Sequence, residues 1–256
     1  MDRRLTFDQV VEIYDRARPS YPDGLVARLF GALPASPHVL EMGPGTGQLT
    51  EQLLRYGAQV TAVELGPNLA RLLESKLGMH GGLRVMNASF EDAPVEPGSF
   101  DGVVAATAYH WVADEAKATR PAELLRAGGC VGVIDLIQVD SPVDRGYFDR
   151  VQSIYDRYGD TNRRWEPTTY ESAMPRVAEV LRASGLYDHV EVHREPWDQT
   201  YTSDEYRDLL YSYSGTQLMT EPERTQMVDE LVAVIDDEFG GTLTRPLVAT
   251  LTLATM

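Results

Sequence analysis

The chain has 256 residues, 43% of them hydrophobic, which suits one large domain or a core domain with substantial insertions. Its net charge of −16, without any visible cluster of Lys and Arg, opposes binding to nucleic-acid phosphates, so we expect a small-molecule substrate and no nucleic-acid partner. No apolar run reaches the roughly 20 residues that span a bilayer, no secretory signal opens the chain, and the single cysteine excludes an internal disulfide, so we expect a cytoplasmic protein without a membrane partner.

Short apolar runs alternate with helical patterns between residues 38 and 138. The runs expected to form strands are 38–42, 59–65, 83–89, 100–108 and 130–138, and the segments expected to form helices are 49–57, 67–78 and 111–128. Alternation of this kind predicts an open parallel sheet with right-handed crossovers. The runs 100–108 and 130–138 are almost continuously apolar, which is typical of strands buried on both faces.

The rest of the chain departs from this rhythm. Residues 143–159 place aromatic side chains at three- and four-residue spacing, and residues 172–186 form another helical pattern. Capping boxes at Thr202 with Glu205, and at Thr220 with Glu223, predict the start of two further helices. The runs 189–197 and 245–256 predict two strands that pair and complete a mostly parallel sheet of seven strands, the last of them antiparallel.

We therefore expect a single compact α/β domain with three segments. Residues 1–30 form an N-terminal helical lid, residues 31–138 form the nucleotide-binding core, and residues 139–256 add helical cap insertions and the last two strands. Nothing in the sequence distinguishes a monomer from a homodimer.

The most informative segment joins the first strand to the first helix of the core. The strand carries Glu41, and Gly43, Gly45 and Gly47 follow before the helix begins. Glycine accepts positive φ and lets a ligand approach the backbone, and the start of a helix offers free N–H groups. At the carboxyl edge of a parallel sheet this loop predicts a nucleotide site. The spacing GxGxG, with Gln48 in the last position of GxGxxG, disfavours a nicotinamide oxidoreductase.

An acidic residue stands where such a site needs one. Glu64 ends the second predicted strand, 21 residues after Gly43. A carboxylate at this position can accept hydrogen bonds from both hydroxyls of a ribose. The sequence therefore predicts that Glu64 anchors an adenosine.

These segments carry a family resemblance. VLEMGPGTGQLT, VTAVELGPNLA, NASFEDAPVEPGSFDGVVAATAYHWV and LLRAGG, in this order, resemble class I S-adenosylmethionine-dependent methyltransferases over residues 7–138. The His-Trp pair and the opening IYDRARPSYP are similar to a small-molecule branch, the trans-aconitate-type and methyltransferase type 11-like enzymes. The resemblance implies a Rossmann-like, doubly wound fold, S-adenosylmethionine as cofactor, and in-line methyl transfer to a small molecule. No spacing of His, Cys, Asp and Glu in the sequence indicates a metal site, so we expect none.

The resemblance also implies a role for each matching position. Glu41 faces the amino group of the cofactor, the glycine backbone passes under its methionine part, Glu64 holds the ribose, and Leu65 lies against the adenine. Ser89 replaces an acid that contacts the adenine amino group, and a hydroxyl can accept that bond less strongly. Phe90 is expected to stack on the purine and to offer its backbone N–H.

The reactive end is expected at the lid and after the fourth strand. The resemblance places Tyr14 and Arg18 over the methionine end, where either can hold its carboxylate, and it places Thr107 and His110 near the sulfonium. His110, with an ordinary pKa near 6.5, is a candidate general base, and Tyr14 is a second candidate catalytic residue. The alternatives are that His110 only shapes the pocket and that Tyr14 and Arg18 belong to a packed or solvated helix.

The substrate side carries little information. Nine of the 13 tyrosines lie at or after Tyr147, and they form either an aromatic pocket or a helical core. Arg163 and Arg164 either bind a substrate carboxylate or are solvated. Two other functions remain open: use of the cofactor for a reaction without methyl transfer, and a non-catalytic binding protein with this fold.

Overall fold

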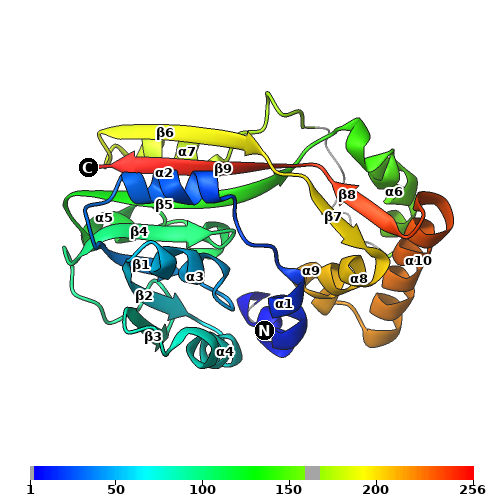
Figure 1. Cartoon of the computed structure of the whole chain (residues 1–256), viewed down its shortest axis with the longest axis horizontal. Coiled ribbons are helices and arrows are strands. Elements are labelled where there is room, and N and C mark those ends of the chain that lie inside the picture. The colour runs from blue at the N-terminus through cyan, green and yellow to red at the C-terminus, as the bar shows by residue number, and fades with distance from the viewer. Residues whose placement is uncertain (1–2, 159–167) are drawn as a thin grey trace. The chain divides into compact units, whose positions relative to one another are not determined.

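The computed structural model describes residues 3–158 and 168–256, which form two compact units (Figure 1). The sheet unit comprises Pro19–Ile137, Met174–Glu195 and Ala249–Met256. The helical unit comprises Met1–Arg18, Gln138–Ala173 and Pro196–Val248. The segmentation predicted from the sequence, with a lid, a core and a cap, stays a prediction.

A seven-stranded sheet has the strand order β3-β2-β1-β4-β5-β9-β6. Its strands are β1 (His38–Met42), β2 (Gln59–Glu64), β3 (Leu83–Asn87), β4 (Phe100–Ala106), β5 (Leu125–Gln138), β6 (His189–Pro196) and β9 (Leu247–Thr255). The pairs joining β1 through β5 are parallel, whereas β9 runs opposite to the strands beside it (Figure 1). The predicted Rossmann-like sheet, with its antiparallel last strand, is confirmed.

The strand order reverses next to β1, and this positions the site. The chain moves outward from β1 to β2 and β3, then returns to the other side of β1 as β4. In open α/β sheets, ligands bind beyond the carboxyl ends of the strands at such a reversal. The carboxyl ends of β1, β2 and β4 are therefore where a ligand of the sheet unit is expected.

Helices of the sheet unit connect these strands. They are α2 (Asp23–Gly31), α3 (Gln48–Arg55), α4 (Pro67–Leu77), α5 (Thr119–Leu124), α7 (Arg176–Ser184) and the 3₁₀ turn η2 (Tyr109–Trp111). The central strands are almost fully buried, and their side chains form a core with apolar residues of the helices and loops. This burial explains why the run that became β4 is almost continuously apolar in the sequence.

The predicted helix over residues 111–128 is wrong. Helix α5 covers only Thr119–Leu124, and β5 already begins at Leu125. Pro121 accounts for part of the difference, because proline is tolerated in the first turn of a helix but removes a hydrogen bond from its interior. Leu125 pairs with Phe100, and the register shifts between Phe100 and Gly102, so the strand pairing extends further back than the apolar run suggests.

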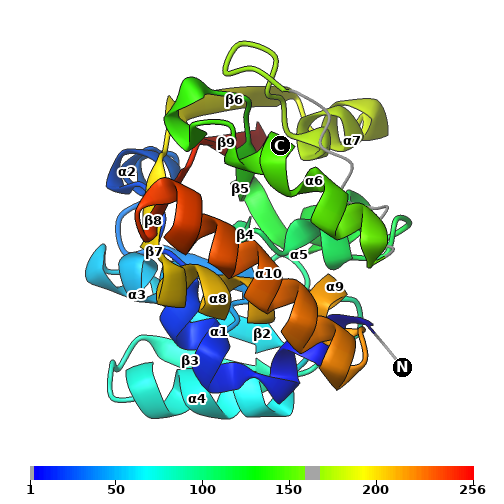
Figure 2. The same ribbon diagram turned by 90° about the vertical axis from the view of Figure 1, so that its right-hand side faces the viewer.

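The helical unit has its own core. Its elements are η1 (Arg3–Gln9), α1 (Val11–Ala17), η3 (Pro142–Asp144), α6 (Tyr147–Arg157), α8 (Ser203–Tyr211), α9 (Ser214–Gln217), α10 (Glu221–Phe239), and an antiparallel pair, β7 (Gln199–Thr202) with β8 (Thr242–Arg245). Helix α8 packs against α1 and α10, and α10 also packs against α6 (Figure 2). Tyr147, Tyr155 and Tyr206 are buried together in this core, so these tyrosines pack rather than line an open surface.

The two predicted capping boxes have different outcomes. At α8 the Thr202 hydroxyl accepts the backbone N–H of Glu205 at 3.3 Å, and the Glu205 carboxylate accepts the N–H of Thr202 at 2.8 Å. This is the complete box. Helix α10 begins as predicted, but its box is wrong, because the Thr220 side chain makes no capping bond and its hydroxyl instead donates to the Glu223 carboxylate at 2.6 Å. The small β7–β8 sheet was not predicted.

Candidate functional site

Three glycines form the loop between β1 and α3. Gly43, Gly45 and Gly47 have φ of +62°, +59° and +100°. A Cβ on Gly43 would lie 2.8 Å from the Cβ of Ala108, and one on Gly47 would lie 2.6 Å from Leu73 Cδ1. Both the backbone conformation and the space therefore require glycine here. The Gly43 N–H donates to Val63 O at 2.9 Å, which ties the start of the loop to β2.

Glu64 joins this loop to the end of β2. One carboxylate oxygen accepts the N–H of Gly45 at 3.0 Å, and the other accepts the N–H of Gly66 at 2.8 Å. The residue is only 7% exposed. The two residues that the sequence paired as loop and ribose anchor are thus brought into direct contact, and the carboxylate orders the loop.

Asn87, at the end of β3, was missed by the sequence reasoning. Its side-chain amide donates to the carbonyl oxygens of Glu64 and Leu65, both at 2.9 Å. These bonds fix the segment after β2, where half-buried Leu65 was predicted to lie against an adenine. Its position could have been noticed in the sequence, because Asn87 is a polar residue at the end of a predicted strand.

Glu41 lies on β1 and is 1% exposed. Its carboxylate accepts a hydrogen bond from the Thr50 hydroxyl of α3 at 2.6 Å. Burial raises the pKa of Glu41 to about 7, with the Thr50 bond opposing the shift and the charge of Glu64 adding to it. A buried carboxylate that is close to half-protonated at neutral pH is well suited to a cationic group.

Ser89 and Phe90, the two predicted adenine contacts after β3, lie in different surroundings. The Ser89 hydroxyl donates to the Asp92 carboxylate at 2.8 Å and accepts the N–H of Asp92 at 3.2 Å. Phe90 is 6% exposed, and its ring belongs to the hydrophobic core. The ring of Phe90 packs in the core of the protein, and the predicted contacts of Ser89 and Phe90 with an adenine stay predictions.

Thr107, directly after β4, has an unusual backbone. Its φ is +51°, a conformation that β-branched residues rarely adopt. Its N–H donates to Ile134 O of β5 at 2.8 Å, and its hydroxyl lies 3.1 Å from the Tyr21 hydroxyl. Tyr21 is in turn held by Gln52 of α3, whose amide accepts the N–H of Tyr21 at 3.3 Å and donates to its carbonyl at 2.8 Å. Strained backbone of this kind concentrates at functional sites.

Tyr109 and His110, which come after Ala108, lie in η2. Tyr109 is buried and donates to Lys117 O at 3.0 Å. His110 is exposed, and its ring centroid lies 4.9 Å from that of Trp111. The predicted base is therefore a solvent-accessible imidazole a few residues after β4.

Asp135, on β5, is a second titratable group that the sequence reasoning missed. It follows Ile134, which pairs with Ala106 of β4. Burial raises the pKa of Asp135 to about 6. Its carboxylate also contributes to the raised pKa of Tyr109, after the larger effects of burial and of Tyr187. Asp135 was hidden within an apolar run that the sequence assigned only to the core.

Tyr14 and Arg18 belong to the helical unit. The Tyr14 ring contacts Phe7 edge-on, with centroids 5.7 Å apart, and the Arg18 guanidinium lies 4.9 Å from the Tyr14 ring centroid. Arg18 also donates to Ser212 O at 3.0 Å. Their predicted contacts with the cofactor remain predictions, and Arg163 and Arg164 lie outside the described residues.

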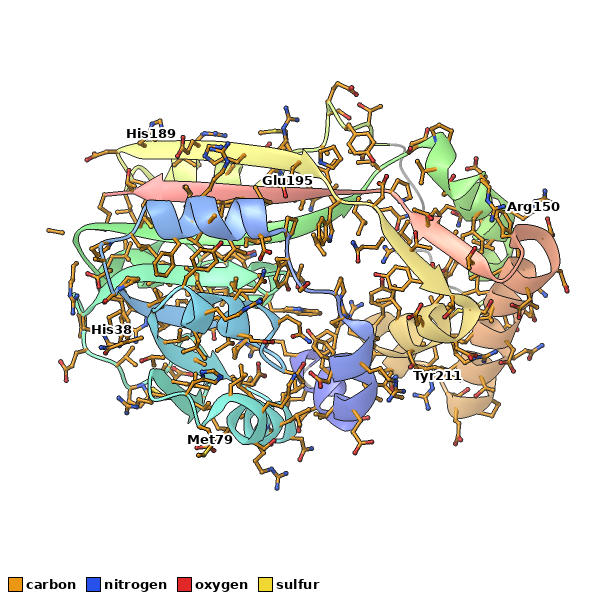
Figure 3. All side chains as sticks on the ribbon, viewed as in Figure 1. His38, Met79, Arg150, His189, Glu195 and Tyr211 are labelled. Carbon is orange, nitrogen blue, oxygen red and sulfur yellow. The ribbon has the colours of Figure 1, made fainter. Side chains whose placement is uncertain are left out.

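His38 has structural partners in the sheet unit. His38, labelled in Figure 3, opens β1, where its Nε2 lies 3.3 Å from the Thr61 hydroxyl and its ring packs against Phe100. Within residues 3–158 and 168–256, no group of three or more His, Cys, Asp or Glu is arranged to hold a metal ion. None of the helices described there has the length and apolar character to cross a membrane.

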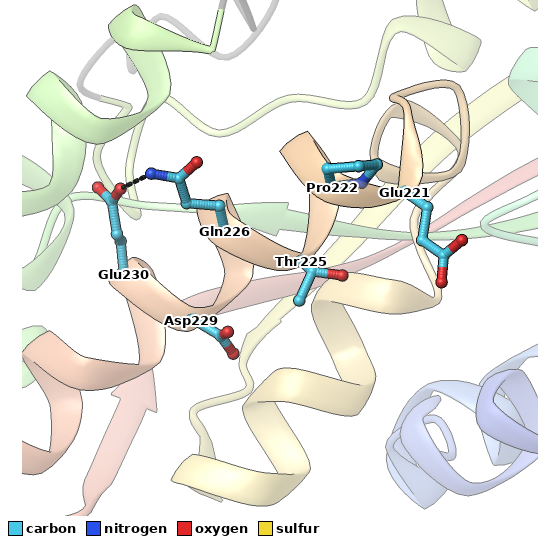
Figure 4. Close-up of a pocket in the computed structure, with 6 residues that line it drawn as sticks. All are labelled: Glu221, Pro222, Thr225, Gln226, Asp229 and Glu230. Carbon is cyan, nitrogen blue, oxygen red and sulfur yellow. Dashed lines mark hydrogen bonds between the residues drawn. The ribbon is translucent and has the colours of Figure 1, made fainter.

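A surface depression of about 520 Å³ lies along α10 (Figure 4). It is lined by Glu221, Pro222, Thr225, Gln226, Asp229 and Glu230. Arg207 forms an ion pair with Asp229, and Arg157 forms one with Glu230. These acids are already neutralised, and the depression holds none of the residues expected to act on a substrate.

Comparison with known proteins agrees with this geometry. Residues 40–132 match the family model described as a methyltransferase domain. An uncharacterized methyltransferase of Mycobacterium tuberculosis is 35% identical over 133 residues, which are 52% of this chain and 53% of the relative. An uncharacterized methyltransferase-like protein of Schizosaccharomyces pombe is 25% identical over 243 residues, covering 94% of this chain and 88% of the relative.

The solved structures support the same fold. A proposed type II methyltransferase from Anaeromyxobacter dehalogenans superimposes with a TM-score of 0.61 at 22% identity, covering 93% of this chain and 96% of that one. The chain spans about half the length of the mycobacterial relatives that it matches. The match to the family model includes the glycine loop, Glu64 and the segment after β3.

Proposed function

We propose that this chain binds S-adenosylmethionine at the glycine loop and transfers its methyl group to a small molecule. The match of residues 40–132 to the methyltransferase-domain family supports this proposal. The acidic net charge of −16 favours a small acceptor over a nucleic acid. The segments that carry the proposal all lie in the sheet unit.

The contact between Glu64 and the glycine loop is the observation that carries the proposal. A carboxylate offers about four lone-pair positions, so Glu64 can order the loop through Gly45 and Gly66 and also accept ribose hydroxyls. The same bonds hold the loop in its left-handed conformation before any ligand arrives. Preorganisation of this kind lowers the entropic cost of binding.

The remaining cofactor contacts follow from the positions of the other residues. Glu41 pairs with the amino group of the methionine part, and the glycine backbone allows that part to approach closely. Leu65 lies against the adenine, while Ser89 and the N–H of Phe90 contact its polar edge. Tyr14 and Arg18 are proposed to hold the methionine carboxylate.

The bound cofactor supplies an electrophilic methyl group on a sulfonium. The chain's own contribution is to align the acceptor with the methyl–sulfur bond, to exclude water, and to accept a proton where the acceptor carries one. His110 and Asp135 are the candidate proton acceptors near the end of β4, and the backbone N–H of Thr107 bonds Ile134, the residue before Asp135. Tyr14 is the candidate catalytic hydroxyl of the helical unit.

Mass spectrometry of a methyl-acceptor screen tests the proposal. Purified protein is incubated with S-adenosylmethionine and pools of small acids, phenols and amines, and products are sought that gain one methyl group. Glu64→Ala is expected to lose the products, whereas Glu51→Ala, on the exposed face of α3, is expected to keep them. A product without added mass would favour a non-methylating reaction, and cofactor binding without turnover on any pool would favour a binding protein.

A further inference from the structure

Two arginines of the helical unit converge on one tyrosine. The Arg18 guanidinium lies 5.0 Å from the Tyr213 ring centroid, and Arg245 donates from one terminal nitrogen to the Tyr213 hydroxyl at 2.7 Å. Arg18 comes from the end of α1, Tyr213 precedes α9, and Arg245 ends β8. Three segments far apart in sequence thus bring two positive charges onto the same ring.

Part of the hydrogen-bonding capacity of Arg245 is not used. A guanidinium has five N–H donors. Arg245 gives one to Tyr213 and one to the Gln138 side chain at 2.7 Å, and its buried Nε has no partner within the described residues. Neither partner is charged. No acid of the described chain forms an ion pair with Arg245 or Arg18.

The same cluster contains further unsatisfied groups. The Nε of Arg18 and the hydroxyl of Tyr201 are buried, and neither donates to an acceptor in the described residues. Burial raises the pKa of Tyr201, while the charges of Arg245 and Arg18 and a hydrogen bond from Arg245 act to lower it. Arg245 can donate to this hydroxyl but cannot accept its proton. We define the oxyanion cluster as Arg18, Tyr201, Tyr213 and Arg245. Three of its donors have no acceptor in the described residues: the Nε–H of each arginine and the O–H of Tyr201.

A buried positive charge is costly unless an anion and hydrogen bonds compensate it. Here two guanidiniums contact the same tyrosine, and no acid pairs with them although the chain has a net charge of −16. We propose that the oxyanion cluster binds a carboxylate or phosphate group of a small molecule. Two oxygens of such a group match the planar donors of a guanidinium, and the Tyr201 hydroxyl can donate to the same group.

Two sources can supply this chemistry. One is the methionine carboxylate of the proposed cofactor, and the other is a separate acid or phosphate ester. The cluster itself is independent of the proposed function, whereas the assignment of the anion to the cofactor rests on it. The experiment therefore measures the anion site and the nucleoside site separately.

Inorganic phosphate is the first probe. Its effect on the melting temperature is measured at constant ionic strength in the wild type, in Arg245→Met, in Arg18→Met and in the control Arg150→Met. Arg150, labelled in Figure 3, forms an exposed ion pair with Glu238 on the same unit. We expect saturable protection of the wild type and of Arg150→Met, and a loss of apparent affinity of roughly 10- to 100-fold in the cluster variants. General salting-out by phosphate acts on all variants alike.

Two nucleosides distinguish the sources. S-adenosylhomocysteine carries the amino-acid carboxylate, and 5′-methylthioadenosine lacks it. If Arg245→Met weakens only S-adenosylhomocysteine, the anion belongs to the cofactor; if both nucleosides bind unchanged while phosphate protection is lost, it belongs to a separate acid. Absence of saturable phosphate protection in the wild type, together with unchanged nucleoside affinities in Arg18→Met and Arg245→Met, would overturn the inference even where the nucleosides bind normally.

Discussion

The Glu64 carboxylate accepts the backbone N–H of Gly45 at 3.0 Å, across 19 positions of sequence. Its other oxygen holds the N–H of Gly66, so a single side chain links the loop after β1 to the loop after β2. The residue proposed to hold the ribose is therefore also a structural part of the glycine loop. This double role changes what a substitution at Glu64 is expected to do.

Glu64→Ala is expected to weaken S-adenosylmethionine binding by about 10- to 100-fold, from the loss of ~1.5–3 kcal/mol of charge-assisted bonding. It should also lower the free energy of unfolding of the ligand-free protein, because two buried N–H groups lose their acceptor. Glu64→Gln keeps one carbonyl acceptor, so its cofactor affinity and its free energy of unfolding should lie between those of the wild type and Glu64→Ala. Calorimetry and urea unfolding measure these effects, and unchanged cofactor affinity in Glu64→Ala would remove the ribose assignment.

Cofactor affinity is expected to rise with pH through about 7, because the pKa of Glu41 is raised to about 7 and an amino group binds the ionised form. Binding should release protons near neutral pH. Calorimetry in two buffers of different ionisation enthalpy at pH 7 detects this release. Glu41→Gln should abolish both the proton release and the pH dependence, whereas pH-independent binding by the wild type would show that Glu41 does not meet the amino group.

Glu41 also makes the ligand-free protein less stable as pH rises. Its folded-state pKa lies above the ordinary value of 4.5, so the unfolded chain ionises first and stability falls between about pH 4.5 and 7. The loss is on the order of 3 kcal/mol for this one group. Urea unfolding measures the free energy of unfolding of Glu41→Gln minus that of the wild type. This difference is expected to be more favourable to the variant at pH 8 than at pH 5, and the opposite trend would contradict the burial of an ionisable Glu41.

Thr107→Gly tests the strain after β4. The positive φ of Thr107 costs about 1–2 kcal/mol for a residue with a Cβ. Thr107→Val and Thr107→Gly both lose the hydroxyl that lies beside Tyr21, but only glycine removes the cost of the positive φ, so Thr107→Gly is expected to be the more stable of the two. Urea unfolding of both variants and of Tyr21→Phe separates the two contributions, and a less stable Thr107→Gly would argue against backbone strain at this position.

The pH–rate profile separates the two candidate proton acceptors. If Asp135 accepts the proton, turnover should fall as pH drops below about 6, the pKa of this buried carboxyl. That limb should disappear in Asp135→Asn and persist in His110→Ala. The reverse pattern would assign the proton to the exposed His110, and a profile unchanged in shape by both substitutions would exclude both residues as the base.

The strands of the sheet were predictable because burial leaves a direct mark on sequence. The runs that became β1, β2 and β4 are mainly apolar, and Gly43, Gly57 and Gly98 in the adjoining loops have positive φ. The helix predicted over residues 111–128 was too long. Strand β5 begins before the apolar run that predicted it, and Pro121 limits the helix. Local pattern does not include the pairing partner, so such boundaries depend on tertiary structure.

The parts of the candidate site that consist of local sequence motifs were predictable, whereas contacts between residues distant in sequence were not. The glycine loop and Glu64 stand at strand ends in a recognisable order, and the structure brings Glu64 and Gly45 into contact, which was not predicted. Asn87 bonds carbonyls 22 and 23 positions away, and Tyr21 meets Thr107 across 86 positions. Neither contact has a periodic signature, because each depends on which strands and helices become neighbours. The roles assigned to individual cofactor-binding residues stay predictions.

The central claim is that the glycine loop with Glu64 binds S-adenosylmethionine. Calorimetric titration of the purified wild type with S-adenosylmethionine, S-adenosylhomocysteine and NADH tests it most directly. We predict micromolar binding of the first two and no binding of NADH. Binding of NADH, or of none of the three, would contradict the account and would remove the basis for the proposed methyl transfer.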